Sequence, residues 1–122
     1  MDSRPSFAVG HIQLRVNDVG AEMAFYLDHG LREIVNRKDF GILELRGGTH
    51  LVLNPVNESE PATTQAPFDL MADDIDAAHA RFVKRGDQAS DIEHGNIHSS
   101  FTVQGPSGYS LRVTSSHVAG PV

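Results

Sequence analysis

HIQLRVNDVGAEMAFYLDHGL (residues 11–31) and FDLMADDIDAAHARFVKRG (residues 68–86) decide the fold, because the two stretches repeat one pattern. Moving the sequence by 56 positions places Asp18 on Asp74. Each copy reads as an alternating strand, an acidic helix start, an amphipathic helix and a glycine stop, followed by further strands. Self-similarity at a fixed offset is typical of a duplicated unit, so the sequence predicts two copies of one module.

The first module is expected to hold four strands and one helix. Ala8 to Val16 alternates apolar and polar side chains, as in a half-buried strand. Asp18 is the expected N-cap of a helix that ends at Gly30. The remaining strands are expected at Arg32 to Val35, Gly41 to Arg46 and Thr49 to Leu53, with Gly47-Gly48 as the turn between the last two.

The second module repeats this order after a polar stretch, Asn54 to Ala66, which contains two prolines and is expected to be a linker. Phe68 to Ala72 is the expected first strand, and a helix is expected between Asp74 and Gly86. The predicted apolar face of this helix holds Ile75, Ala78, Phe82 and Val83. The later strands are expected at Gln88 to Glu93, Ile97 to Val103 and Tyr109 to Thr114, and the tail from Ser115 to Val122 is expected to cover a sheet edge, reach a partner chain or be disordered.

The β-α-β-β-β order, read twice, predicts an α+β fold. We expect one domain over residues 1–122, with the first module at about 7–54, the linker at about 55–66 and the second module at about 67–115. The predicted architecture is two curved mixed sheets around a cleft, with the helices on the outer face, because helices cover the apolar face of a sheet.

Composition excludes several functional classes. The chain has 122 residues, 39% hydrophobic and 21% charged, which suits one globular domain. No apolar run approaches the roughly 20 residues of a membrane span, and the N-terminus lacks a signal-type segment. Cysteine is absent, which favours the cytoplasm and excludes thiolate chemistry. The net charge of −6, without a basic cluster, excludes a nucleic-acid footprint and serves either solubility or attraction of a cationic ligand.

Strand alternation separates two faces of each predicted sheet. Apolar residues such as Leu51, Leu53, Leu111 and Val113 face the helices. The opposite face collects His11, Gln13, Arg15, Glu44, His50, Asp69, His98, Ser100, Thr102, Ser110 and Arg112. This face is either simply solvated or lines a pocket between the two sheets. Of the other histidines, His29, His79, His94 and His117 are expected to be solvated.

The duplicated βαβββ pattern resembles the vicinal oxygen chelate superfamily, which includes glyoxalase I, extradiol dioxygenases, fosfomycin- and bleomycin-resistance proteins and methylmalonyl-CoA epimerase. GPSGYSLRV (residues 105–113) is similar to the closing turn and strand of that family, and the resemblance runs from about Phe7 to Ser115. It implies a small-molecule ligand and a homodimer. It does not choose a reaction, because the superfamily spans isomerases, lyases, transferases, dioxygenases and binding proteins.

The enzymes of this superfamily hold a divalent metal on the cleft face. The residues that match their ligand positions are His11, Val52, Pro67 and Arg112. Only His11 suits a metal, because proline offers no side-chain ligand and a guanidinium has only donors. The resemblance therefore implies that the usual metal is absent, and no cofactor is expected.

A different metal site is the alternative. His50 lies on the same predicted face as His11, so the two imidazoles with Asp69 or Glu44 would make a site for zinc, iron or nickel. The competing interpretation is that both histidines are hydrogen-bonded and hold no metal.

Three functions follow. The first is a small-molecule binding protein or metal-free enzyme of the glyoxalase/bleomycin-resistance type, with the ligand between the modules. His11 or His50 would then be the general base, and Arg112 would either hold an oxyanion or only pair with Asp69. The second is a metal-dependent lyase or dioxygenase that uses His11, His50 and one carboxylate, and any enzyme activity is expected to be that of a lyase, isomerase or dioxygenase. The third is an antibiotic-sequestering protein, which the absence of tryptophan disfavours. The expected ligand-binding residues are Gln13, Arg15, Glu44, Asp69, His98 and Ser110.

Overall fold

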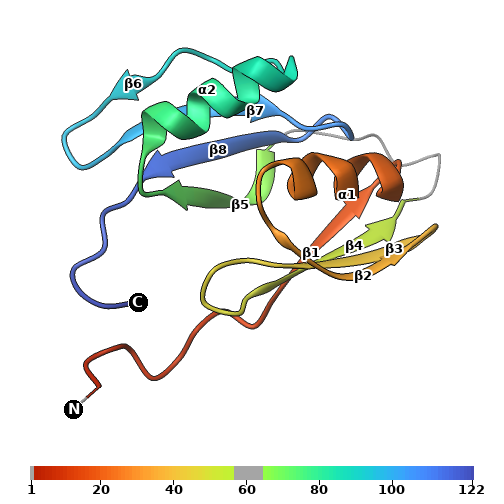
Figure 1. The fold of residues 1–122 in the computed structure, drawn as a ribbon, viewed down its shortest axis with the longest axis horizontal. Helices are drawn as coiled ribbons and strands as arrows, with labels where there is room; N and C mark the ends of the chain where they lie inside the picture. Colours follow the sequence, from red (N-terminus) through yellow and green to blue (C-terminus); the bar gives the residue numbers. More distant parts are fainter. Residues whose placement is uncertain (1, 57–64) are drawn as a thin grey trace. The chain divides into compact units, whose positions relative to one another are not determined.

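The computed structural model describes residues 2–56 and 65–122. These residues form two compact units, one of residues 2–56 with 118–122 and the other of residues 65–117. Each unit contains one helix and one four-stranded sheet (Figure 1). Among the described residues, no helix is long and apolar enough to cross a bilayer.

The two units share one topology, which confirms the predicted duplication. The first contains β1 (His11–Val16), α1 (Val19–Asp28), β2 (Arg32–Arg37), β3 (Phe40–Glu44) and β4 (His50–Pro55), in the sheet order β1-β4-β3-β2. The second contains β5 (Gln65–Ala72), α2 (Ile75–Arg85), β6 (Glu93–His94), β7 (Ser99–Gln104) and β8 (Ser110–Ser115), in the order β5-β8-β7-β6. β1 is parallel to β4 and β5 to β8, and the other neighbours are antiparallel.

Both helices begin as the sequence predicts, and α2 also ends as predicted, whereas α1 ends at Asp28 with His29 as its C-cap, just before Gly30 with its φ of 90°. A carboxylate oxygen of Asp18 accepts a hydrogen bond of 3.0 Å from the backbone N–H of Ala21, and Asp74 does the same for Ala77 at 3.0 Å. These caps satisfy N–H groups that have no partner within the helix. At the end of α2, Gly86 has a φ of 92°, a left-handed conformation that favours glycine.

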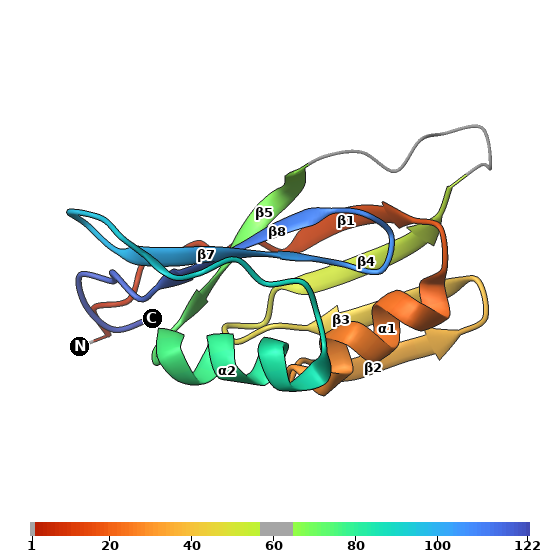
Figure 2. The same ribbon diagram turned by 90° about the horizontal axis from the view of Figure 1, so that it is seen from above.

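Each helix covers one face of the sheet in its own unit (Figure 2). Beneath α1, the side chains of Leu14, Leu43 and Leu51 are fully buried, and beneath α2 the rings of Phe82 and Phe101 lie 5.8 Å apart. Burying an aliphatic or aromatic side chain of this size contributes roughly 1.5–3 kcal/mol. Apolar alternation therefore directs the remaining positions of each strand to the face that carries no helix.

Several predicted boundaries were wrong. Of the predicted strand Gln88 to Glu93, only Glu93 lies in a strand, β6 (Glu93–His94), and Ala89 adds a single bridge. The Ser90 hydroxyl accepts the N–H of Thr102, which replaces regular pairing there. The first strand begins at His11, and Ile97 precedes β7 in a loop, where it is 82% exposed.

The ends of the predicted linker also belong to strands. Asn54 and Pro55 close β4, and Gln65 and Ala66 begin β5. Residues 57–64 of the predicted linker lie outside the described residues.

The apolar face of α2 also differs from the prediction. Val83 is 53% exposed, whereas His79, which was expected to be solvated, is half-buried. The His79 ring packs edge-to-face on Phe101 at 4.9 Å, and its Nε2 donates a hydrogen bond of 2.8 Å to the carbonyl oxygen of Ser90. Residues 79 and 82 are three apart on a helix, so they share the face that meets the sheet.

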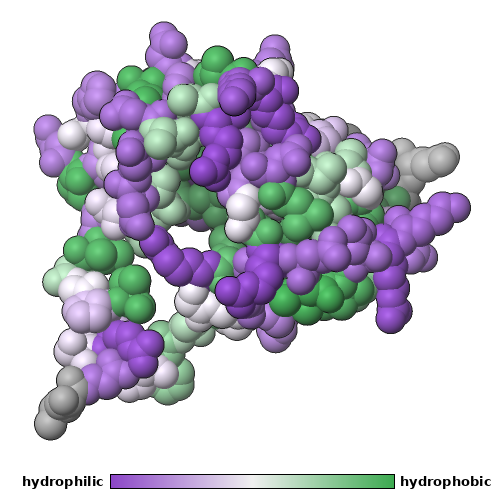
Figure 3. Space-filling model, viewed as in Figure 1, coloured by the Kyte–Doolittle hydropathy of each residue, from purple (hydrophilic) through white to green (hydrophobic). Residues whose placement is uncertain are grey.

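His29 also differs from the prediction, whereas His94 is exposed as expected. His29 is half-buried, with its ring 5.2 Å from that of Phe25, and His94 Nδ1 shares a hydrogen bond of 2.8 Å with the Ser99 hydroxyl. The face shown in Figure 3 mixes polar and apolar residues, and among the described residues Phe7 and Ile97 are the most exposed large apolar side chains.

Candidate functional site

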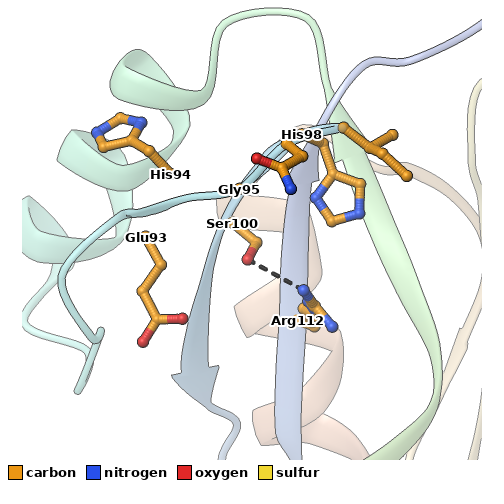
Figure 4. A pocket seen from close by; sticks show the side chains of 8 residues that line it. Glu93, His94, Gly95, His98, Ser100 and Arg112 are labelled. Atoms are coloured by element: carbon orange, nitrogen blue, oxygen red, sulfur yellow. Dashed lines mark hydrogen bonds between the residues drawn. The ribbon is translucent and has the colours of Figure 1, made fainter.

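A pocket of about 310 Å³ lies in the second unit, beside the strands β6, β7 and β8 (Figure 4). The residues that line it come from these strands and the loop between β6 and β7: Glu93, His94, Gly95, Asn96, Ile97, His98, Ser100 and Arg112. Its volume is at the lower end of the range of small-molecule sites, which is about 300–1,000 Å³.

Arg112 is the cation of this pocket. Its neighbours along β8, Leu111 and Val113, are buried in the core, so alternation directs Arg112 to the opposite face. The guanidinium donates a hydrogen bond of 3.2 Å from Nη2 to the Ser100 hydroxyl (Figure 4). Asp69 is the register partner of Arg112 on β5, yet within the described ranges no ion pair joins them. The simple Asp69–Arg112 pairing that the sequence left open is therefore not formed.

His98 forms another wall of the pocket. Its Nδ1 is buried and, within residues 2–56 and 65–122, has no hydrogen-bond partner. The ring lies 5.1 Å from the ring of His117. Because an unsatisfied N–H is costlier to bury than an unused acceptor, the neutral ring favours its proton on Nε2. The loop is held by a hydrogen bond of 3.1 Å from the Gly95 N–H to the His98 carbonyl oxygen, which leaves little room for a side chain at residue 95.

A row of polar side chains crosses all four strands of the sheet in the first unit. The strand register places His11, His50, Glu44 and Arg32 in one row. The imidazole centroids of His11 and His50 lie 5.7 Å apart, edge-to-face. His50 Nε2 lies 3.1 Å from Glu44 Oε1, and Arg32 Nη1 donates a hydrogen bond of 2.7 Å to Glu44 Oε2. The prediction that residues 11 and 50 are neighbours on one face is thereby confirmed.

The other predicted site residues divide between the units. Gln13 and Arg15 continue along β1, and Gln13 Oε1 accepts a hydrogen bond of 3.2 Å from Asn54. In the second unit, Asp69 is exposed and Ser110 is half-buried. His11, Gln13, Arg15, Glu44 and His50 thus belong to the first unit, and Asp69, His98, Ser110 and Arg112 to the second. The cleft between the modules stays a prediction.

The residues at the family's metal positions do not fit a metal ion. Val52 is apolar and 8% exposed, and residues 67 and 112 are a proline and an arginine. In the alternative set, both oxygens of Glu44 are engaged by His50 and Arg32, and Asp69 belongs to the other unit, so this metal site stays a prediction. In the described part of the chain, no group of three or more histidine, aspartate or glutamate residues is arranged to hold a metal.

Sequence reasoning missed Arg32, Asn54 and the pocket-lining loop that contains Asn96 and Ile97. Arg32 reaches Glu44 only because β2 pairs with β3 in a register that shifts between Glu33 and Val35. Such an irregularity leaves no signal in the alternation of side chains. The loop before β7 was not predicted, because Ile97 was expected to begin a strand.

No protein-family model matches the sequence, and no curated protein matches it significantly. Several solved structures, by contrast, match the chain over most of its length. The lactoylglutathione lyase from Agrobacterium tumefaciens superimposes with a TM-score of 0.76 at 21% identity, covering 97% of this chain and 100% of that one. An antibiotic binding protein from Streptomyces sp. CB03234 gives 0.75 at 18% identity, covering 92% and 98%. The bleomycin-binding protein from Streptomyces verticillus gives 0.69 at 19% identity, covering 93% and 99%.

The chain therefore shares its fold with these solved structures, in agreement with the fold that the sequence resemblance implied. The likeness is one of fold, and the structures that share it include an enzyme and two binding proteins. Function has to be argued from the side chains of this chain.

Proposed function

We propose that the protein binds a small organic oxyanion, such as a carboxylate or an enolate, in the pocket of the second unit. The observation that carries this proposal is the guanidinium of Arg112, which lines a pocket of about 310 Å³ and whose hydrogen-bond partner there is a neutral hydroxyl. Because the Arg112 guanidinium has several N–H donors and donates one hydrogen bond to Ser100, its other N–H groups can bind a ligand. Arginine recognises carboxylates by two parallel hydrogen bonds.

The hydrogen-bond donors beside Arg112 support an anion, while Glu93 is the carboxylate that lines the same pocket. Ser100 and Asn96 offer neutral polar groups, and the preferred tautomer of His98 offers an N–H from Nε2. In a metal-free enzyme, the same arrangement would stabilise negative charge that develops on a substrate oxygen. The proposed function is therefore binding of an oxyanion. Catalysis would additionally need a general base.

Thermal-shift and calorimetric titrations with a panel of monocarboxylates and 2-oxo acids test the proposal, with the matching neutral amides as controls. We expect the carboxylates to bind and the amides not to bind. Arg112→Met should weaken binding at least about tenfold, which corresponds to about 1.4 kcal/mol. Arg37→Met, which removes an exposed arginine of β2, should leave binding unchanged. Equal binding by Arg112→Met, or no carboxylate binding at millimolar concentration, would refute the proposal.

Sequestration of a cationic antibiotic is the second candidate. It is favoured by two similar structures whose descriptions name antibiotic or bleomycin binding, and by the net charge of −6. Titration with bleomycin separates the two candidates. Tight binding that Arg112→Met leaves intact would support sequestration, because a cationic drug gains nothing from a guanidinium.

We further propose that the protein acts as a cytoplasmic homodimer without a cofactor. The absence of cysteine suits a reducing compartment, and the edge strands of the two sheets carry backbone groups that can pair with another chain. Light scattering after gel filtration measures the oligomeric state, and metal analysis of protein purified without chelator measures the cofactor content. A monomeric mass would contradict the proposed homodimer. A stoichiometric amount of a transition metal would contradict the proposed absence of a cofactor.

A further inference from the structure

We propose that His50, Glu44 and Arg32 form a hydrogen-bond-accepting site in the first unit, directed at the hydroxyl group of a ligand such as an alcohol, phenol or enol. The site uses none of the residues of the second-unit pocket, so it goes beyond the function proposed above. It rests on one row of the sheet, in which His50, Glu44 and Arg32 occupy adjacent strands.

Both oxygens of the Glu44 carboxylate are engaged. Glu44 Oε2 accepts a hydrogen bond of 2.7 Å from Arg32, and Glu44 Oε1 lies 3.1 Å from His50 Nε2. The Glu44 side chain is only 21% exposed, so it is partly shielded from water. An ionised carboxylate only accepts hydrogen bonds, so His50 Nε2 has to carry the proton.

The other ring nitrogen of His50, Nδ1, is the proposed hydrogen-bond acceptor. With the proton on Nε2, Nδ1 of neutral His50 bears a lone pair. Across the ranges that the structure describes, this nitrogen has no hydrogen-bond partner, and it is not among the fully buried atoms. It is therefore an acceptor with access to solvent, held by a ring whose orientation Glu44 determines. A carboxylate that orients an imidazole in this way is a recurring means of preparing a histidine to accept a proton.

The side chains beside His50 determine which kind of ligand suits this acceptor. His11 packs edge-to-face against His50 and has an exposed side chain. The next row along the strands holds Gln13 beside Val52, and the Gln13 amide oxygen accepts a hydrogen bond from Asn54, which lies beside Arg15 in the row beyond. His11 and Gln13, the polar neighbours nearest to His50 on β1, carry no permanent charge, so the surface directly beside His50 suits a neutral hydroxyl donor. Arg32 and Glu44 are positioning residues here, because they act through His50.

Nuclear magnetic resonance of the imidazole nitrogens tests the site in mildly alkaline buffer with phenol as the probe. We expect His50 to show one tautomer, with an observable, slowly exchanging Nε2 proton, and we expect phenol to shift the Nδ1 resonance. Glu44→Gln should abolish the protected Nε2 proton and weaken the phenol response about tenfold, the effect of losing one well-oriented hydrogen bond. Arg32→Met should have the same effect to a smaller degree.

Glu33→Gln is the matched control, because it removes an exposed carboxylate of the neighbouring strand β2 and should leave both signals unchanged. A proton on Nδ1 in the wild type, an unchanged Nε2 proton in Glu44→Gln, or a phenol response that does not involve His50 would each overturn the inference. The amide spectrum of each variant reports whether it is folded. Carboxylate binding through Arg112 is measured separately, so the two proposals can fail independently.

Discussion

Replacing Gly41 with alanine should destabilise the protein by overpacking the core beneath α1. A Cβ atom at residue 41 would lie 2.6 Å from Sδ and 3.1 Å from Cγ of Met23, and 3.6 Å from Cγ1 of Val19. Atoms in contact pack best at about 3.5–4.0 Å, so the thioether would have to move. Met23 is 1% exposed and is therefore enclosed by other side chains. Forcing an extra methyl group into such a core lowers the free energy of unfolding by about 1–3 kcal/mol.

Urea denaturation followed by circular dichroism measures this loss. The comparison needs the wild type, Gly41→Ala, Met23→Ala and the double variant. Met23→Ala costs about 2–5 kcal/mol by itself, but it removes the atoms that a Cβ would strike. In that background, Gly41→Ala should therefore cost less than about 0.5 kcal/mol.

Gly10→Ala is the matched control, because a Cβ there meets nothing within 4 Å. It should change the free energy of unfolding by no more than about 0.5 kcal/mol. The reasoning is refuted if Gly41→Ala costs the same in both backgrounds, or no more than Gly10→Ala.

Other substitutions test the helices. Alanine at the N-cap Asp18 or Asp74 should lower the free energy of unfolding by about 0.5–2 kcal/mol in urea titrations, and no loss would argue against the capping hydrogen bonds. Gly86→Ala should lower it by about 1–2 kcal/mol, because alanine resists the left-handed conformation, and a neutral result would contradict that φ. Phe82→Ala should cost about 3–5 kcal/mol and Val83→Ala less than about 0.5 kcal/mol, whereas similar losses would place α2 in another orientation.

The candidate sites show where sequence reasoning ended. Alternation alone placed His11 and His50 on one face, and the parallel pairing of β1 with β4 made them register partners. The same alternation placed Arg112 opposite the core residues Leu111 and Val113. Alternation cannot say which charged groups meet, however, because a contact between strands depends on their register. The structure pairs Glu44 with Arg32 rather than leaving it for a metal, and it leaves Asp69 without an ion pair to Arg112.

The amino-acid pattern by itself determined the duplicated topology, the two N-caps and the glycine stops, because these depend on local dihedral preferences and on periods of 2 and 3.6 residues. Only the tertiary structure decided that His79 packs on Phe101 while Val83 is exposed, because the rotation of α2 on its sheet is set by side-chain packing. It likewise decided the pocket beside Arg112. The loop that encloses this pocket has no periodicity, and its shape depends on hydrogen bonds such as the one from Gly95 to His98.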